Sequence, residues 1–237
     1  RNVFSEDLAK ARLAGWITGD GSVGVYDNVM RLEIITINDD EHEAVLRDVA
    51  EVFPGANYWV DGFKTQNTNL TGRRVHIAGK KIEGFVGEYS LHRQGTMVAV
   101  PHRILTASPQ EKREFLKALF QADGCVRIRQ DDKRNSGDVC LTTISDELSF
   151  GVLQLLNSLG IYSRISLNTD KREDRHDTKQ VIIAYGSARQ QYAEQIGFIS
   201  SEKQDKLELL QKLVTHSKTL PLIREEEIIG IERMGMR

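Results

Sequence analysis

The sequence has little cysteine, no long apolar run and no excess of charge of either sign. Its 237 residues include 2 cysteines, and 32 Lys and Arg stand against 34 Asp and Glu. No stretch approaches the roughly 20 apolar residues that a membrane-spanning helix needs, and the charged start is unlike a signal peptide. Two cysteines fit a reducing cytosol and leave one disulfide open. We therefore expect a cytoplasmic globular protein without a membrane partner, in which any affinity for nucleic acid comes from local charge.

One nine-residue pattern is present twice. Leu13–Gly21 reads LAGWITGDG, and Leu116–Gly124 reads LKALFQADG. Each pattern predicts a helix that ends at an aspartate, Asp20 or Asp123, before a glycine suited to a left-handed C-terminal cap. A single helix ending in Asp-Gly is common for purely structural reasons. Recurrence of the aspartate, the glycine and the spacing of small residues favours a functional role.

The pattern opens a longer internal duplication. Matching residues lie 103, 107 and 110 positions apart, respectively, in the pairs Asp20 and Asp123, Asn38 and Ser145, and Arg93 and Lys203. Each copy reads as helix, two strands, helix, two strands, helix. We expect an α+β fold of two αββαββα repeats related by a pseudo-twofold axis. The predicted boundaries are 1–105 and 106–218 for the repeats and 219–237 for a remainder.

Caps, turn residues and alternation predict the individual elements. The first repeat is expected to hold a helix over 6–20 after a Ser5 N-cap, strands at 22–28 and 31–37, a helix ending at Phe53, and strands at 58–63 and 73–78, joined by a polar loop at 66–69. The second is expected to place Pro109 in the first turn of its motif helix, with strands at 125–130, 138–143, 163–168 and 180–185.

The motif helices are predicted to pack closely, because small residues recur four positions apart. These are Gly15 and Gly19 in one helix and Ala118 and Ala122 in the other, with Leu13, Trp16, Ile17, Leu116, Leu119 and Phe120 around them. If the helices are parallel, their C-terminal ends, which carry partial negative charge, converge with Asp20 and Asp123. Carboxylate and carbonyl oxygens are the ligands of a hard cation such as Mg²⁺. Such a cation suits phosphodiester cleavage.

At these residues the sequence resembles a single-chain LAGLIDADG homing endonuclease, over residues 5–216. The resemblance implies that the motif helices form the interface between repeats, and that Asp20 and Asp123 bind catalytic Mg²⁺ or Mn²⁺. The carbonyls of Gly19 and Ala122 are implied as further ligands, and Ca²⁺ is expected to support binding without cleavage. The implied partner is double-stranded DNA, held in the major groove by a saddle of antiparallel strands. The implied reaction of this monomer is a double-strand break across the minor groove of a long site, with short 3′ overhangs.

The resemblance also implies a basic residue in each repeat near the scissile phosphate. The duplication offers Arg93 and Lys203, and Lys206 is an alternative one helical turn beyond Lys203. Because the pair is not two lysines, the repeats are expected to cut unequally. Solvated helix-end charges are the competing interpretation. Asn38 and Ser145 match a position that can hydrogen-bond the active-site water in relatives.

Strand alternation predicts which side chains face DNA. Val126 and Ile128 are expected to pack inward, as are Val23 and Val25 in the first repeat. Arginine can pair with guanine edges and asparagine with adenine, while others contact phosphates. The predicted DNA-facing residues are Ser22, Gly24, Tyr26, Arg31, Glu33, Arg74, His76, Arg127, Arg129, Thr142, Arg164, Ser166 and Asn168, beside a polar tip at 130–134.

Other charged residues carry simpler interpretations. Asp39, Asp40, Glu41 and Glu43 are interpreted as acids that favour a helix N-terminus. The scattered histidines form no i, i+4 pair, so a zinc site is not expected. Residues 220–237 resemble the opening of an intein's C-terminal splicing block, whereas the His-Asn pair and N-terminal Cys or Ser needed for splicing are absent. We therefore expect an intein's endonuclease domain that does not itself splice, with an ordinary edge strand as the alternative.

Three other functions stay open. A maturase-like RNA-binding protein keeps the fold without cleavage, although the presence of both Asp20 and Asp123 argues against it. A LAGLIDADG-type transcription regulator usually brings a further DNA-binding domain, and none is expected after residue 218. A metal hydrolase with another substrate needs an enclosed pocket, which the repeat does not suggest.

Overall fold

The chain is described by a computed structural model that covers residues 4–64, 71–130, 135–169 and 176–214. The predicted loop at 66–69, nearly all of the predicted tip at 130–134 and the remainder at 219–237 lie outside the described residues. Within the described ranges, no helix is long and apolar enough to cross a membrane.

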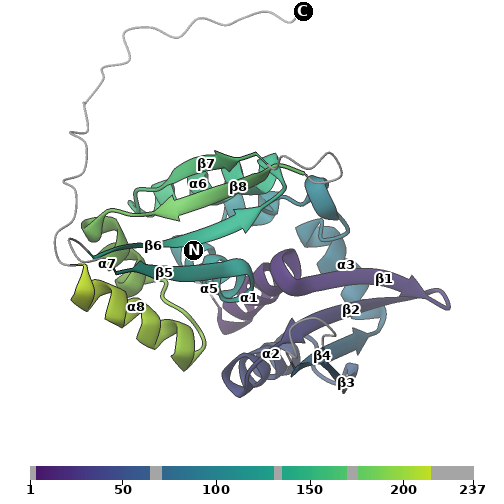
Figure 1. Ribbon diagram of the computed structural model, residues 1–237. Helices are drawn as coiled ribbons and strands as arrows, with labels where there is room; N and C mark the ends of the chain where they lie inside the picture. The colour runs from purple at the N-terminus through teal and green to yellow at the C-terminus, as the bar shows by residue number, and fades with distance from the viewer. Residues whose placement is uncertain (1–3, 65–70, 131–134, 170–175, 215–237) are drawn as a thin grey trace, which may run out of the picture.

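Two four-stranded antiparallel sheets flank a central pair of helices (Figure 1). The first repeat comprises α1 (Ser5–Asp20), β1 (Gly21–Tyr26), β2 (Val29–Thr36), α2 (Asp39–Val52), β3 (Asn57–Lys64), β4 (Thr71–Ala78) and α3 (Lys80–Tyr89). The connection contains η1 (Gly95–Met97) and α4 (His102–Leu105). The second repeat comprises α5 (Pro109–Asp123), β5 (Gly124–Arg129), β6 (Ser136–Thr143), α6 (Asp146–Ser158), β7 (Arg164–Asn168), β8 (Thr178–Ile183), α7 (Gly186–Gln195) and α8 (Ser201–Leu213).

The sheets have matching topologies, which confirms the predicted αββαββα plan. Their strand orders are β1-β2-β4-β3 and β5-β6-β8-β7. In each sheet alternate residues point into the core, among them the buried Leu32, Ile34, Val75 and Ile77 in the first and Val139, Leu141, Val181 and Ile183 in the second. The opposite face of each sheet, here called the open face, therefore carries the other half of the strand residues.

The motif helices α1 and α5 pack closely at the centre, as predicted, and they run parallel. A Cβ placed on Gly15 would lie 2.4 Å from the Phe115 carbonyl oxygen and 2.9 Å from Cβ of Ala118. One turn further along, a Cβ on Gly19 would lie 2.6 Å from Cβ of Ala122. The glycines of α1 thus let the backbones approach, and both helices run towards the same end. Leu13, Trp16, Leu116 and the other predicted apolar neighbours are buried around this contact.

The glycine after each motif has a different role from the one predicted. Gly21 has φ −110° and Gly124 has φ −84°, so neither adopts a left-handed cap. Each begins a strand directly. A Cβ would lie 2.4 Å from Cα of Ile17 at Gly21 and 2.5 Å from the Phe120 carbonyl oxygen at Gly124. Lack of space, rather than a positive φ, requires glycine where the helix turns into the strand.

Two further expectations for the first repeat are wrong in detail. Helix α1 begins at Ser5 itself, so Phe4 and not Ser5 is the N-cap. Val25 is 63% exposed although its neighbour Val23 packs against the core. The β1–β2 hairpin projects beyond the helices in Figure 1, so its far end extends past the described helices that cover the rest of the sheet.

A buried ion pair joins the helices behind the motif. Arg12 on α1 contacts Asp48 on α2 through Nε and Nη2, at 2.9 and 2.7 Å, and its Nη1 lies 2.7 Å from Glu114 on α5. Asp48 is 1% exposed. Bidentate pairing of this kind fixes geometry as well as charge, so Arg12 ties the two repeats together.

Candidate active site and nucleic-acid interface

Asp20 and Asp123 meet at the common end of α1 and α5. A Cβ placed on Gly19 would lie 3.4 Å from Oδ2 of Asp123, so the second aspartate leans against the last turn of the first helix. Burial raises the pKa of Asp123 to about 6, and the nearby charge of Asp20 adds to this rise. Burial also raises the pKa of Asp20, with a further contribution from Glu41. The end of the helix pair is therefore an acidic site, with Asp20 half-buried and Asp123 exposed, that favours a cation.

Lys203 is the basic residue nearest to this site. It lies in the first turn of α8, and its Nζ donates to the carbonyl oxygens of Gln121 and Gly124, the latter at 2.9 Å. These carbonyls bracket Asp123 in the sequence. The charge of Lys203 lowers the pKa of both aspartates against the effect of burial. Burial in turn lowers the pKa of Lys203, while the charges of Glu41, Asp20 and Asp123 oppose that shift.

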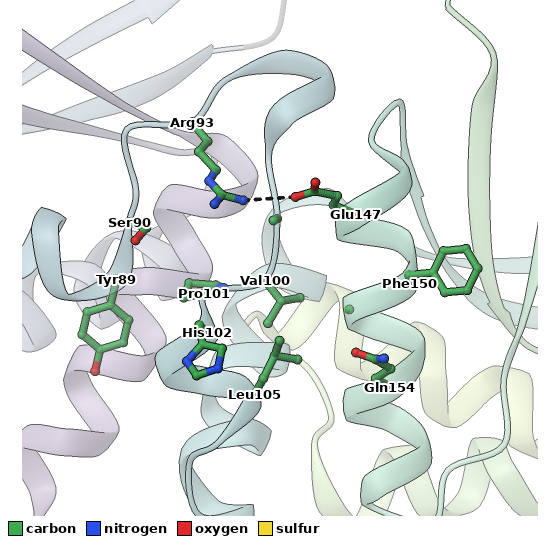
Figure 2. Close-up of a pocket in the computed structure, with 12 residues that line it drawn as sticks. Tyr89, Ser90, Arg93, Val100, Pro101, His102, Leu105, Glu147, Phe150 and Gln154 are labelled. Atoms are coloured by element: carbon green, nitrogen blue, oxygen red, sulfur yellow. Dashed lines mark hydrogen bonds and ion pairs between the residues drawn. The ribbon is translucent and has the colours of Figure 1, made fainter. Parts of the chain in front are cut away.

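Arg93 lies beside the first motif but is engaged elsewhere. Its Nη1 is 3.1 Å from Oε2 of Glu147 on α6. Figure 2 shows this exposed ion pair among the residues that line a pocket. Arg93 also lines an open cavity of about 330 Å³ together with Thr18, Gly19 and Gly21. Arg93 thus lies near the end of the first motif and Lys203 near the end of the second. Of the two, only Lys203 contacts a motif residue.

The open face of the first sheet carries a stack of aromatic and charged side chains. The guanidinium of Arg31 lies 4.5 Å from the ring centre of Tyr26 and 4.8 Å from that of Trp59. Trp59 in turn stacks on His76, with ring centres 4.8 Å apart and planes 7° apart. Nε of Arg31 has no hydrogen-bond partner among the described residues. That Nε is buried, so the guanidinium is held by stacking on its faces and this atom is not open to a ligand.

Charged groups frame that stack. Glu33, opposite His76 in the strand register, lies 3.4 Å from its Nδ1, and Asp61 lies 3.2 Å from its Nε2. Glu33 also pairs with Arg74 at 3.8 Å, and Arg74 lies over the ring of Phe63. The predicted positions Ser22, Gly24, Tyr26, Arg31, Glu33, Arg74 and His76 all share this face. Sequence alternation did not single out Trp59, Asp61 or Phe63.

The open face of the second sheet is more polar and has no comparable stack among the described residues. Arg127 donates to Asp138 at 2.6 Å and to Gln180 at 3.0 Å. Cys125 lies opposite Cys140 in the register, and the two free thiols have their Sγ atoms 3.3 Å apart. The other predicted positions share the face: Arg129, Thr142, Arg164 and Asn168 are exposed, and Ser166 is half-buried.

Comparison with known proteins agrees with this architecture. Residues 110–197 match the family described as LAGLIDADG-like domain. The second repeat is therefore similar to a LAGLIDADG-like domain. Three solved structures share the fold across both repeats. These are the homing endonuclease I-WcaI bound to its DNA recognition sequence (TM-score 0.54, 17% identity, 85% of this chain and 86% of that one), the LAGLIDADG meganuclease I-AabMI bound to uncleaved DNA (0.52, 12%, 87% and 90%), and the N-terminal LAGLIDADG domain of DUF199/WhiA (0.50, 11%, 92% and 85%).

Curated relatives are much longer proteins with unrelated names. The chain is 25% identical over 202 residues to the DNA polymerase of Thermococcus sp. strain GE8, covering 82% of this chain and 11% of the polymerase. It is 25% identical to the ATP-dependent DNA helicase Hel308 of Thermococcus kodakarensis, over 79% of this chain and 16% of the helicase. It is 24% identical to the alpha chain of the ribonucleoside-diphosphate reductase NrdEB of Bacillus subtilis, over 73% and 16%. The chain thus spans about a tenth to a sixth of these relatives.

Two candidate functional residues beside the paired aspartates, Glu41 and Gln121, were not identified from the sequence. Glu41 is 5% exposed and accepts from Gln121 Nε2 at 2.6 Å, across the boundary between the repeats. Glu41 therefore does more than place negative charge at a helix N-terminus. Asn38 caps α2 by accepting from the Glu41 amide. Ser145 caps α6 in the same way. Lys206 is exposed and turned to solvent one turn after Lys203.

The chemistry of the site at Asp20 and Asp123 fits a hard divalent cation. The carboxylates of Asp20 and Asp123 lie together, with raised pKa values that a nearby positive charge would lower. Oxygen is the donor atom that Mg²⁺, Mn²⁺ and Ca²⁺ prefer. No group of three or more His, Cys, Asp or Glu side chains in the described part of the chain is arranged to hold a metal. Ligands besides Asp20 and Asp123 would have to come from backbone carbonyls, water or substrate phosphate.

Proposed function

We propose that this chain is a site-specific DNA endonuclease of the LAGLIDADG homing type. On this proposal one monomer binds a long duplex site and makes a double-strand break with short 3′ overhangs. The observation that carries the proposal is the pairing of Asp20 and Asp123 at the ends of two parallel helices, beside Lys203. A fold used only for binding has no need of two carboxylates brought together at a cost in electrostatic repulsion.

Asp20 and Asp123 are the residues proposed to hold Mg²⁺ or Mn²⁺, with the carbonyls of Gly19 and Ala122 as helpers. When bound, the metal would activate water and stabilise the leaving oxygen of a phosphodiester. The aspartates must lose their protons to bind it, so the rise in the pKa of Asp123 makes metal binding weaker below about pH 6. Lys203 would place positive charge beside the scissile phosphate of one strand. Arg93 is proposed to do so for the other.

The two open faces are proposed to bind the DNA. Arg31 lies in the aromatic stack of the first face, and Arg74, Arg129 and Arg164 add positive charge. Such groups supply base contacts and salt-dependent phosphate affinity. Because both sheets belong to one chain, a single molecule can cover both half-sites. The proposed location is inside the cell, where the target DNA lies.

An origin within an intein is also proposed. A polymerase, a helicase and a nucleotide reductase carry out different reactions, yet each shares a segment with this chain. A segment that recurs in unrelated hosts is best explained as an insertion that moves independently of them. The resemblance of residues 220–237 to a splicing block points the same way. Sequencing the complete reading frame would test this, because host sequence should continue on both sides.

The decisive experiment is selection from a randomised duplex library. Incubation with Mg²⁺ should yield one long cleaved site, and Ca²⁺ should give binding to the same site without cleavage. Asp20→Asn and Asp123→Asn should each abolish cleavage and retain binding in Ca²⁺. Glu43→Gln, which removes an exposed carboxylate from α2, is the matched control and should cut normally.

A non-cleaving LAGLIDADG protein, either an RNA maturase or a transcription regulator, is the competing function. The likeness to the DUF199/WhiA domain concerns the fold alone. Binding to duplex DNA in Mg²⁺ without any cut would support the regulator and defeat the nuclease. Selective binding to folded RNA over every duplex would support the maturase.

A further inference from the structure

A buried polar network links the repeats on one side of the motif pair. At its centre is Gln121, which is 1% exposed and lies two residues before Asp123. Its Nε2 donates to Glu41 at 2.6 Å and to Ser200 Oγ at 2.9 Å. Its Oε1 accepts from the amides of Ile199 and Ser200, at 2.9 and 3.0 Å. Both donors and both lone pairs of this amide are used, so its orientation is fixed.

Glu41 anchors the network from the other repeat. One carboxylate oxygen accepts from Gln121, and the other accepts from the Ile37 amide at 2.7 Å. Next to it, Asp40 Oδ2 accepts from the amide and hydroxyl of Ser201, at 2.7 and 2.8 Å. The first turn of α2 therefore holds the first turn of α8 at two points. At one of these points Gln121 bridges Glu41 and Ser200, and at the other Asp40 contacts Ser201 directly.

This arrangement determines where Lys203 lies. Lys203 follows Ser200 by three residues, and its amide donates to the Ser200 hydroxyl at 3.4 Å, as expected for an N-capped helix. Ser200 is itself held by Gln121. The ammonium then returns to the carbonyl of the same Gln121. Gln121 thus positions Lys203 in two ways. Its side chain holds the N-cap of α8, and its backbone carbonyl accepts from the Lys203 ammonium group.

The other side of the motif pair lacks this network in the described part of the chain. The duplication places Leu148 where Glu41 stands, and Thr18 where Gln121 stands. Leucine's side chain cannot accept a hydrogen bond, and the Thr18 hydroxyl is used within its own helix, on the Ala14 carbonyl. Arg93, the counterpart of Lys203, pairs with Glu147, and the space at Thr18 and Gly21 stays an open cavity.

We propose that Glu41 and Gln121 are positioning residues for Lys203, and that they make the cleavage centre on the Lys203 side act first. One DNA strand is cut by a centre whose ammonium group is in place before DNA arrives. The second strand waits for Arg93 to leave Glu147. This inference rests on the proposed endonuclease function and adds to it two residues and an order of events.

The test uses the duplex recovered from the library, with each strand end-labelled differently, and single-turnover rates measured for each strand in Mg²⁺. Lys203→Ala identifies the strand that depends on Lys203. Glu41→Gln keeps the side-chain size but removes the charge and one acceptor, so it should slow that same strand at least about tenfold and change the other less than about twofold. Glu43→Gln, on the exposed side of α2, should leave both rates unchanged.

A merely structural role for Glu41 predicts a different pattern. Binding in Ca²⁺ and the thermal unfolding midpoint are measured for every variant, and Glu41→Gln should keep the binding constant within about twofold. In the double variant with Lys203→Ala, Glu41→Gln should cost nothing further on the Lys203-dependent strand, because its partner is gone. Gln121→Glu, which places a second carboxylate against Glu41, should slow the same strand.

Three results would overturn the inference while leaving the endonuclease intact. They are equal slowing of both strands by Glu41→Gln, full additivity with Lys203→Ala, and wild-type cutting that begins with the Arg93-dependent strand. Failure of the wild-type chain to cut any recovered duplex would instead overturn the proposed function, and this inference with it.

Discussion

The two sheets share a topology but differ in what holds their open faces in place. In the first, Arg31 is sandwiched between Tyr26 and Trp59, so its position depends on aromatic stacking. In the second, Arg127 is fixed by hydrogen bonds to Asp138 and Gln180, and Asp138 is only 6% exposed. Duplication thus preserved the backbone and its core, while the open faces diverged. Arg31 on β2 belongs to a stacked surface, whereas Arg127 on β5 belongs to a hydrogen-bonded one.

The two central helices also differ, because α1 leaves no room for a side chain at Gly15 whereas α5 carries a methyl group at the matching Ala118. Gly15→Ala places a Cβ 2.4 Å from a backbone oxygen of α5, so the unfolding free energy should fall by ~3 kcal/mol or more. Ala118→Gly, at the matching position of α5, removes a methyl without any clash and should cost only about 1 kcal/mol. Urea denaturation measures both. Gly84→Ala in α3, where nothing lies within 4 Å, is the control and should be neutral or slightly stabilising.

The two open-face arginines should separate stability from binding. Arg127→Ala leaves the buried Asp138 without its closest partner, and we expect a loss of about 2 kcal/mol in unfolding free energy. Arg31→Ala should change stability by less than about 1 kcal/mol but weaken duplex binding roughly tenfold. Denaturation and a binding titration in Ca²⁺ check the pair. Equal effects of the two substitutions on stability would remove the distinction drawn between the sheets.

The smallest expected effect concerns Asp123 without metal. Its folded-state pKa of about 6 lies above the ordinary 3.8, so the stability of the protonated form is lost as pH rises through that interval. In EDTA above pH 6, Asp123→Asn should therefore be more stable than the wild type, by no more than about 1 kcal/mol because solvent screens this exposed carboxylate. The difference should vanish below about pH 4. Added Ca²⁺ should stabilise the wild type and not the variant, and a variant that is less stable at pH 7.5 would contradict this electrostatic account.

Local sequence signals predicted the parts of the molecule that depend on short-range pattern. The repeat offsets indicated the two αββαββα units, and the small residues of the motif indicated the close packing at Gly15 and Gly19. Alternation failed at Val25, because exposure there depends on how far the helices extend and not on the strand itself. It also did not reveal Trp59, whose partners lie on other strands.

The network around Gln121 shows why part of the site could not be predicted. Glu41 stands three residues after an Asn38 cap, and that local role fully accounts for an acid at this position. Nothing in the spacing says that a glutamine 80 residues later will meet it. A buried contact between distant residues is decided by tertiary packing, so the sequence of one chain gives no signal for it.

The hydrogen bonds from Ser201 to Asp40 and from Gln121 to Glu41 also limit how freely the repeats can be exchanged. A chimera that joins the second repeat to a new first repeat must bring Asp40 and Glu41 with it, or Ser201 and Gln121 lose their partners. A symmetric dimer made from two second repeats would offer Glu147 and Leu148 in their place, and Leu148 cannot take the hydrogen bond from Gln121. The two repeats are therefore not interchangeable. When one repeat is exchanged to change specificity, these four residues have to be kept together.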